Sequence, residues 1–374
     1  MKKKIVYSEA DCGGIQPKPL TVKAKYIEPA NYFPEETRKK FKLGEYAESK
    51  DLIMIKSVIL GHAVGDALGV PVESCNRKKL EEKPVTEMLG YGAHEVPAGS
   101  WSDDTSMSLA ALDSLAKGKL DLFDIMLNFV KWLENGEYTP TGKSFDVGRT
   151  CLNAIRNFHN NCYTNEGEYI IPPDFDITEC GEEGELCNGN GSLMRINPFI
   201  LWARFKSGER VDIEELVEQA SKITHAHERS VLACKIYALL MYYLIADQSR
   251  GSLLFALDDI YCRYCDEKEY PHFARIFDEN FANLPVDEIK STGYVVDSLE
   301  AAIWCLLNTD NYKDCVLKAV NLGGDTDTIA AIAGGFAGLM YGYESIPQEW
   351  LDTLIKREEI EELCERAERA WRNL

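Results

Sequence analysis

Apolar residues recur at intervals of three and four positions along most of the chain from residue 51 onward, which is the spacing typical of helices. The clearest run covers residues 51–69, begins at the candidate cap Asp51 and ends before Pro71. Comparable runs predict further helices over 121–134, 146–158, 213–224, 228–246, 296–307, 312–322, 328–341 and 347–372. Segments that alternate apolar and polar residues are scarce. The pattern therefore predicts a nearly all-α protein with short turns and a longer polar insertion around residues 160–187.

Residues 1–50 show no sustained hydrophobic period and hold four of the fourteen prolines. We therefore expect these residues to form an N-terminal extension that packs over or beside the core. The length of 374 residues by itself allows one large domain or two ordinary ones.

The net charge of −20 argues against a broad nucleic-acid surface, which would need a basic stripe. A basic or phosphate-bearing partner fits this charge better. We find no apolar segment of signal-peptide length and no run that approaches the roughly 20 apolar residues of a membrane span, so we expect no membrane partner. Twelve cysteines without a signal sequence indicate reduced thiols rather than a disulfide framework, which predicts a cytoplasmic protein.

The first predicted helix carries a stripe of glycines. Gly61, Gly65 and Gly69 lie four positions apart, so one face of the helix has no side chains. Either another helix or a ligand could approach this face closely.

Two predicted helices begin with crowded acids, in the motifs GSWSDDT and GGDTDT. One Ser, Thr or Asp side chain is enough to cap a helix start. Asp103 with Asp104, and Asp325 with Asp327, each add a second carboxylate, and crowded like charges must protonate or bind a cation. The simpler alternative is two acid-rich helix starts on the solvated surface.

These four carboxylates are accompanied by neutral oxygen donors, namely Ser102, Thr105, Thr326 and Thr328. Oxygen-rich ligand sets favour Mg²⁺, Mn²⁺ or Ca²⁺ over zinc, and four negative charges would balance two divalent ions. If the two motifs meet in the fold, they predict a dinuclear metal site. Such a site can orient a substrate diol and activate a bound water.

Three other motifs contain candidate functional residues. In GDALGVPVE, Asp66 lies within the first helix and Glu73 lies just beyond its Pro-terminated end, where Glu73 could act as a general base or be an ordinary loop acid. In GNGSLMR, glycines would let backbone N–H groups approach a phosphate or ribose. In FDVGRT, Asp146 could simply cap the helix that follows.

The motifs GDALGVPVE, GSWSDDT, FDVGRT, GNGSLMR, ITHAH and GGDTDT occur in this order between residue 51 and about residue 345. This ordered set resembles the ADP-ribosylglycohydrolase family. That family includes dinitrogenase reductase-activating glycohydrolases, ADP-ribosylarginine and ADP-ribosylserine hydrolases, and crystallin-like members without known turnover. The resemblance implies an all-α orthogonal helical bundle with two Mg²⁺ or Mn²⁺ ions in a cleft, built from a catalytic domain of residues 51–374.

The resemblance also implies roles for individual residues. The metal ligands would be Ser102, Asp103, Asp104, Asp325, Asp327 and Thr328. Ser102 stands where the family usually has Thr, a change that keeps the hydroxyl oxygen. The catalytic residues would be Glu73, Asp104 and Asp146. Glu73 matches an acid that closes over the metals or acts on the substrate, and Asp146 resembles the acid that arginine-directed members place near the guanidinium.

The remaining matches concern the substrate. Asn190, Gly191 and Ser192 match the loop that lines the ADP-ribose groove, and His225 matches a histidine beside it. The implied function is metal-dependent removal of ADP-ribose from a modified protein side chain, with arginine favoured, or from a small ADP-ribose conjugate. Two alternatives stay open: a non-catalytic ADP-ribose-binding or structural protein, and a hydrolase of serine-linked, O-acetyl or nucleotide substrates.

Overall fold

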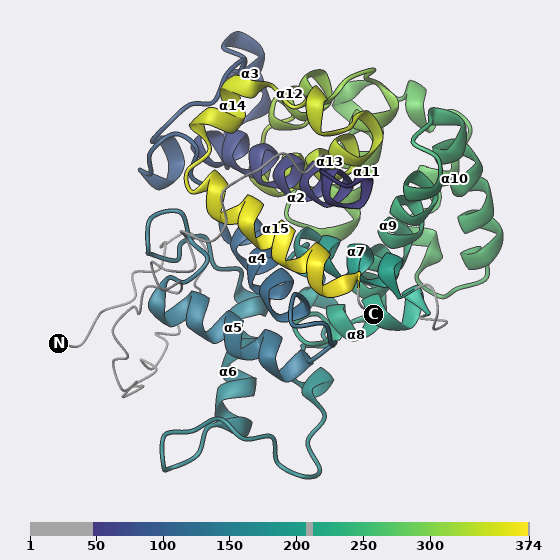
Figure 1. Ribbon diagram of the computed structural model, residues 1–374. Helices are drawn as coiled ribbons and strands as arrows, with labels where there is room; N and C mark the ends of the chain where they lie inside the picture. The colour runs from purple at the N-terminus through teal and green to yellow at the C-terminus, as the bar shows by residue number, and fades with distance from the viewer. Residues whose placement is uncertain (1–47, 207–211, 373–374) are drawn as a thin grey trace.

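The computed structural model describes residues 48–206 and 212–372, and within these ranges it contains fourteen α-helices, three isolated bridges and no β-strand. The all-α prediction is confirmed. The helices are α2 (Lys50–Gly69), α3 (Arg77–Glu82), α4 (Asp103–Leu115), α5 (Leu122–Asn135), α6 (Arg149–Cys162), α7 (Asn197–Phe205), α8 (Ile213–Lys222), α9 (Glu228–Ala246), α10 (Arg250–Tyr264), α11 (Val295–Leu307), α12 (Tyr312–Val320), α13 (Thr326–Tyr341), α14 (Gln348–Thr353) and α15 (Arg357–Trp371) (Figure 1).

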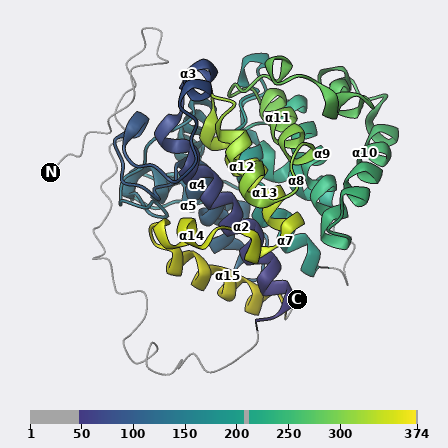
Figure 2. The same cartoon turned by 90° about the horizontal axis from the view of Figure 1, so that it is seen from above.

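Helices α2 and α13 lie side by side in the middle of the bundle and form its most extensive helix pair (Figures 1 and 2). The glycine stripe makes this possible. A Cβ atom at Gly65 would lie 2.0 Å from Ala330 O, and one at Gly69 would lie 2.4 Å from the Asp327 Cα. Of the two occupants considered for the glycine face, the structure shows a helix, α13.

The other helices surround this pair. Helices α11 and α12 pack on α13, while α15 covers both α2 and α4, and α4 in turn contacts α5 and α7 (Figure 2). The start of α4 and the start of α13 are therefore both held close to α2. Between α6 and the short 3₁₀ turn at Leu193–Arg195 the chain makes a long excursion, the predicted polar insertion (Figure 1).

Several predicted helix ends differ from the structure. The cap of α2 is Ser49 rather than Asp51, because the Ser49 side chain accepts the Leu52 N–H bond. The predicted helix over 347–372 is two helices, divided at Lys356, which adopts a left-handed φ of +53°. Helices α7 and α10 were not predicted, because the segments that form them are short or only weakly periodic.

The expectation that no run approaches the length of a membrane span does not hold for two helices. Helices α2 and α9 reach the length and mean hydropathy of a membrane-spanning helix. In the fold, 89% of the most apolar window of α2 and 72% of that of α9 is buried against other helices, as in core helices of a bundle.

Candidate functional site

The two acidic helix starts meet inside the fold. Thr328 Oγ1, in the first turn of α13, donates a 3.3 Å hydrogen bond to Asp104 Oδ2, in the first turn of α4, although the two residues are 224 positions apart in the sequence. Ser102 Oγ donates a 2.8 Å bond to the same carboxylate oxygen. Asp104 and Asp327 are fully buried. The alternative of two separate, solvated helix starts is therefore wrong.

Asp66 of α2 anchors the start of α4. Its Oδ1 accepts the Ser102 N–H bond at 2.9 Å, and its Oδ2 accepts bonds from Thr105 N at 3.0 Å and Thr105 Oγ1 at 2.7 Å. These bonds satisfy backbone donors that a helix start leaves without partners. Asp66 therefore fixes where the first acidic motif lies relative to α2.

A Gly-Gly turn precedes α13 and positions the second acidic motif at the start of this helix. Gly323 and Gly324 both adopt a φ of +73°, a conformation that side chains rarely tolerate, and a Cβ at Gly324 would lie 2.0 Å from Ser291 O. Asp325 N donates to the same Ser291 carbonyl at 2.9 Å. Thr326 Oγ1 then donates to Gly69 O at 2.8 Å, which ties the start of α13 to the end of α2.

A second group of ligand-type side chains borders the first. Glu73, His94, Asp146 and Asp327 each place one such atom within 4.8 Å of the others. His94 Nε2 is hydrogen-bonded to Glu73 Oε2, and the His94 ring packs against Phe145 at a centroid distance of 5.0 Å. Three other segments of the chain thus converge on Asp327.

Asp146 does not cap the helix that follows it. Helix α6 begins at Arg149, its N-cap residue is Gly148, and no side chain supplies a capping bond. Asp146 adopts a φ of +53°, a conformation in which Asp and Asn are enriched. Burial, reinforced by Glu73, raises the pKa of the Asp146 carboxyl to about 7, while His94 opposes that shift.

Burial dominates the electrostatics of the acidic residues. It raises the pKa values of Asp103, Asp104 and Asp327 well above the usual range, and neighbouring carboxylates raise them further. Burial also raises the pKa of Asp325, although the bond from Asn190 opposes that shift. A cation among these groups would reverse the direction of the shifts, because it stabilises the ionised carboxylates.

The oxygen donors fit a hard divalent cation. Asp104 Oδ1 and Asp327 Oδ2 are buried and have no hydrogen-bond partner in the part of the chain that the structure describes. Together with Asp66, these residues place carboxylate oxygens within 4.8 Å of one another. Buried carboxylate oxygens without donors are costly, and a divalent ion would satisfy them.

The predicted substrate loop lies against both the acids and α11. Asn190 Nδ2 donates to Asp325 Oδ2 at 2.7 Å and to Ser298 Oγ at 2.8 Å, so this side chain positions an acid. Ser192 is fully buried, and its hydroxyl is hydrogen-bonded to Ser221 and Cys234. The Ser192 hydroxyl is therefore engaged within the fold.

The two histidines of the ITHAH motif have different environments. The side chain of His227 caps α9 by accepting the Arg229 N–H bond at 3.1 Å and contacts Glu185, so it has a structural role. His225 is buried, with only 2% of its surface exposed, and its ring approaches Gly191. Of the pair, only His225 lies at the predicted substrate loop.

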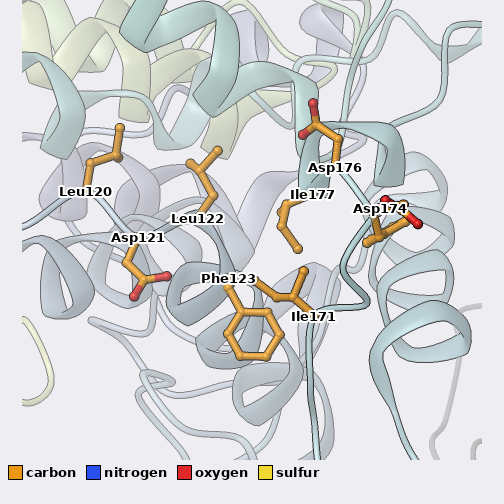
Figure 3. Close-up of a pocket in the computed structure, with 9 residues that line it drawn as sticks. Leu120, Asp121, Leu122, Phe123, Ile171, Asp174, Asp176 and Ile177 are labelled. Carbon is orange, nitrogen blue, oxygen red and sulfur yellow. The ribbon is translucent and has the colours of Figure 1, made fainter.

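A separate open groove runs between the start of α5 and the polar insertion (Figure 3). It contains none of the predicted site residues. Its lining consists of Leu120, Asp121, Leu122, Phe123, Ile171, Asp174, Phe175, Asp176 and Ile177.

Comparison with known proteins agrees with this arrangement. The ADP-ribosylglycohydrolase family model matches residues 49–373. The chain belongs to the ADP-ribosylglycohydrolase family. It is thus a member of a family of hydrolytic enzymes that act on ADP-ribosyl groups.

Three relatives and one solved structure illustrate the match. An ADP-ribosylarginine hydrolase Tri1 from Serratia proteamaculans is 34% identical, with 85% of this chain and 80% of that protein covered. A Tri1 from Pseudomonas putida is 31% identical (83% and 76% covered), and an ADP-ribosyl-[dinitrogen reductase] glycohydrolase from Rhodospirillum rubrum is 32% identical (81% and 90% covered). A solved ADP-ribosylglycohydrolase-related protein complex superposes with a TM-score of 0.69 at 28% identity, with 86% of this chain and 99% of that chain covered.

Two members of this ADP-ribosylglycohydrolase site received no role from the sequence. Asp66 was noticed within its motif, but its bonds to Ser102 and Thr105 depend on the approach of α4 to α2. His94 gave no local signal, because a lone histidine in a Gly- and Pro-containing loop has no diagnostic spacing. Its position five residues before the first acidic motif was the only available indication.

Proposed function

We propose that this chain is a divalent-metal-dependent hydrolase that releases ADP-ribose from an arginine side chain of a modified protein. The observation that carries the proposal is the convergence of Glu73, Asp146 and Asp327 within 4.8 Å, next to buried carboxylate oxygens that lack donors. A carboxylate for a guanidinium, a candidate base and a cation site would then share one centre.

The metal would be two Mg²⁺ or Mn²⁺ ions held by Ser102, Asp103, Asp104, Asp325, Asp327 and Thr328. Asp66, behind Ser102, fixes the position of the first three of these residues. When bound, such ions supply Lewis acidity toward the ribose hydroxyls and a water molecule. The oxygen-only character of the six side chains favours these hard cations over zinc.

Asp146 would hold the leaving group. A guanidinium is planar and presents a fork of N–H donors, so a carboxylate beside it can accept two charge-assisted hydrogen bonds. In this role Asp146 must be ionised, and a bound cation nearby would favour the ionised form over the raised pKa of the metal-free protein.

Glu73 would act as the base. Its Oε2 is engaged by His94 Nε2, which leaves Oε1 to receive a proton from the attacking water. His94 also packs on Phe145, the residue before Asp146, and this contact restrains the His94–Glu73 pair. Asp104 would contribute through its contact with Ser102 and Thr328 rather than by proton transfer.

The names of the relatives support the choice of substrate. Two of them are ADP-ribosylarginine hydrolases, and a third acts on ADP-ribosylated dinitrogen reductase. We therefore take ADP-ribosylated protein as the partner of this chain, with arginine as the linkage residue.

A panel of ADP-ribosylated peptides that differ only in the linkage residue tests the proposal. Each peptide, together with O-acetyl-ADP-ribose and a nucleotide, is assayed for free ADP-ribose and for phosphate with Mg²⁺, with Mn²⁺ and with a chelator. We expect metal-dependent release from the arginine peptide. The double variant Asp325→Ala, Asp327→Ala should lose this release, whereas Asp174→Asn, an exposed acid of the separate groove, should retain it.

Other outcomes would point elsewhere. Equal release from the serine peptide would overturn the arginine assignment, and phosphate release would indicate a nucleotide hydrolase. ADP-ribose binding in calorimetry without turnover of any substrate would make the chain a non-catalytic binder.

A further inference from the structure

The buried His225 ring has one nitrogen engaged within the fold and one directed at the substrate loop. His225 Nδ1 lies 2.9 Å from Thr224 Oγ1. A Cβ atom at Gly191 would lie 2.9 Å from His225 Cε1 and 3.3 Å from Nε2, and one at Gly189 would lie 3.7 Å from Nε2. The Nε2 edge of the ring thus reaches the loop only because residue 191 has no side chain.

Thr224 Oγ1 has a second partner, the buried guanidinium of Arg195. Arg195 Nη2 donates to Thr224 Oγ1 at 2.7 Å and to Ala220 O at 2.9 Å, and the guanidinium stacks over the Phe129 ring at 5.0 Å. Arg195 is fully buried, and its bonds to Thr224 and Ala220 together with the Phe129 contact hold the guanidinium in place.

The chemistry of these three groups, together with the burial of Thr224, indicates the direction of the bonds. A guanidinium only donates, so Thr224 Oγ1 accepts from Arg195. The Thr224 hydroxyl is buried and has one proton to give, and within the described residues its other hydrogen-bond neighbour is His225 Nδ1. A proton on Nδ1 would leave the buried hydroxyl proton without an acceptor, which is costly, so Nδ1 accepts and the proton of the neutral imidazole is on Nε2.

We propose that Arg195 and Thr224 are positioning residues that hold His225 in the Nε2-protonated tautomer, so that Nε2 donates a hydrogen bond to an acceptor oxygen of ADP-ribose at the Gly189–Gly191 loop. This inference rests on the proposed function for the identity of the ligand. The tautomer itself depends only on the relay from Arg195 through Thr224 to His225.

The His225 ring is neutral when it donates this hydrogen bond. Burial lowers the pKa of His225 to about 3, and the positive charge of Arg195 contributes to the shift. A neutral imidazole with its lone pair already engaged at Nδ1 can donate through Nε2 but cannot take up a proton from water. His225 is therefore a ligand-orienting donor rather than a general base.

The test uses the full chain with ¹⁵N-labelled histidine and compares it with Thr224→Val and Thr224→Ser. We expect the unmodified chain to show a protonated Nε2 and an unprotonated Nδ1 at His225. Thr224→Val keeps the shape of the side chain but removes the hydroxyl, so the tautomers should mix and ADP-ribose affinity should fall about fivefold, the effect of one lost hydrogen bond. Thr224→Ser restores the hydroxyl and should restore both readouts.

A second titration locates the acceptor. A shift of the Nε2 signal with ADP alone assigns the acceptor to the diphosphate portion, whereas a shift only with ADP-ribose assigns it to the terminal ribose. Either shift supports the donor role, and no shift at saturating ADP-ribose overturns it.

The relay and the donor role of His225 can be disproved separately. A proton on Nδ1 in the unmodified chain, which needs no variant to detect, overturns the relay. An unchanged tautomer in a folded Thr224→Val variant does so as well. Absence of ADP-ribose binding with the expected tautomer would overturn the proposed function and the donor role but leave the relay standing.

Discussion

Asp104 and Asp327, each in the first turn of its own helix, bring carboxylate oxygens within 4.8 Å of one another inside the fold. One oxygen of each carboxylate is buried without a donor among the described residues. Like charges this close favour either protonation or a bound cation, so the stability of the protein should depend on divalent metal.

Metal should therefore raise the melting temperature. At a free concentration of 100 times the dissociation constant, Mg²⁺ or Mn²⁺ bound only by the folded state adds about 2.7 kcal/mol to the free energy of unfolding. Asp327→Asn removes one of the crowded charges, so it should raise stability in chelator and lose most of the metal-induced shift. Differential scanning calorimetry with and without metal measures both effects. Asp174→Asn should behave like the unmodified chain, and a metal-independent melting temperature in that chain would contradict the cation site.

Asp146→Asn should slow cleavage of arginine-linked substrate selectively. The variant keeps the size of the side chain and tolerates the left-handed φ of +53°, but it replaces a charge-assisted hydrogen bond with a neutral one. We expect a loss of about 2 kcal/mol of transition-state stabilisation, or roughly 30-fold in kcat/KM. ADP-ribose affinity and the metal-induced shift should persist. Unchanged kcat/KM on the arginine peptide would remove Asp146 from the leaving-group role.

Gly65→Ala should destabilise the fold and disturb the site together. The added Cβ would lie 2.0 Å from Ala330 O, so α2 must move away from α13 at a cost of about 1–3 kcal/mol. Asp66, the next residue, anchors the start of α4, so metal affinity should fall as well. Denaturant unfolding and metal titration measure the two effects.

Gly251→Ala is the matched control for this substitution. Gly251 lies in α10, and the nearest atom to an added Cβ is Ser249 Oγ at 3.7 Å. Alanine there should raise stability by about 0.4–1 kcal/mol, because it restricts the unfolded chain and favours the helix. If Gly65→Ala and Gly251→Ala changed the free energy of unfolding equally, the contact between α2 and α13 would not require glycine at position 65.

Glu134 should make stability fall as the pH rises. Burial raises the pKa of this carboxyl, near the end of α5, from 4.5 to about 7, so between these values the folded state holds a proton that the unfolded state has released. The resulting stabilisation is complete below pH 4.5 and is lost as the pH passes 7. Glu134→Gln should be more stable than the unmodified chain at pH 8, by on the order of 1 kcal/mol after allowance for partial exposure, and equally stable at pH 4. Melting curves of both proteins at pH 8 and pH 4 test this prediction. An equal stability difference between variant and unmodified chain at both pH values would exclude ionisation of Glu134 as the cause.

Local periodicity alone determined much of this protein. Apolar spacing predicted the all-α class and most of the long helices, because a helix repeats its environment every three to four residues wherever it packs. The acidic motifs were recognisable because two crowded carboxylates exceed what a helix cap needs. The glycine stripe likewise predicted that another group would approach this face of the first helix closely, although it did not indicate whether that group would be a helix or a ligand.

The tertiary structure decided everything that depends on which segments meet. It joined Thr328 to Asp104, paired His94 with Glu73, and turned Asp146 away from the cap of α6 toward Asp327. The relay from Arg195 to His225 likewise depends on the end of α8 lying against the substrate loop, where Ser221 bonds Ser192. Such contacts join residues tens to hundreds of positions apart, and their formation depends on how whole helices bury their apolar faces. Because no local pattern records that packing, the sequence could name these acids and histidines but could not say which of them share a site.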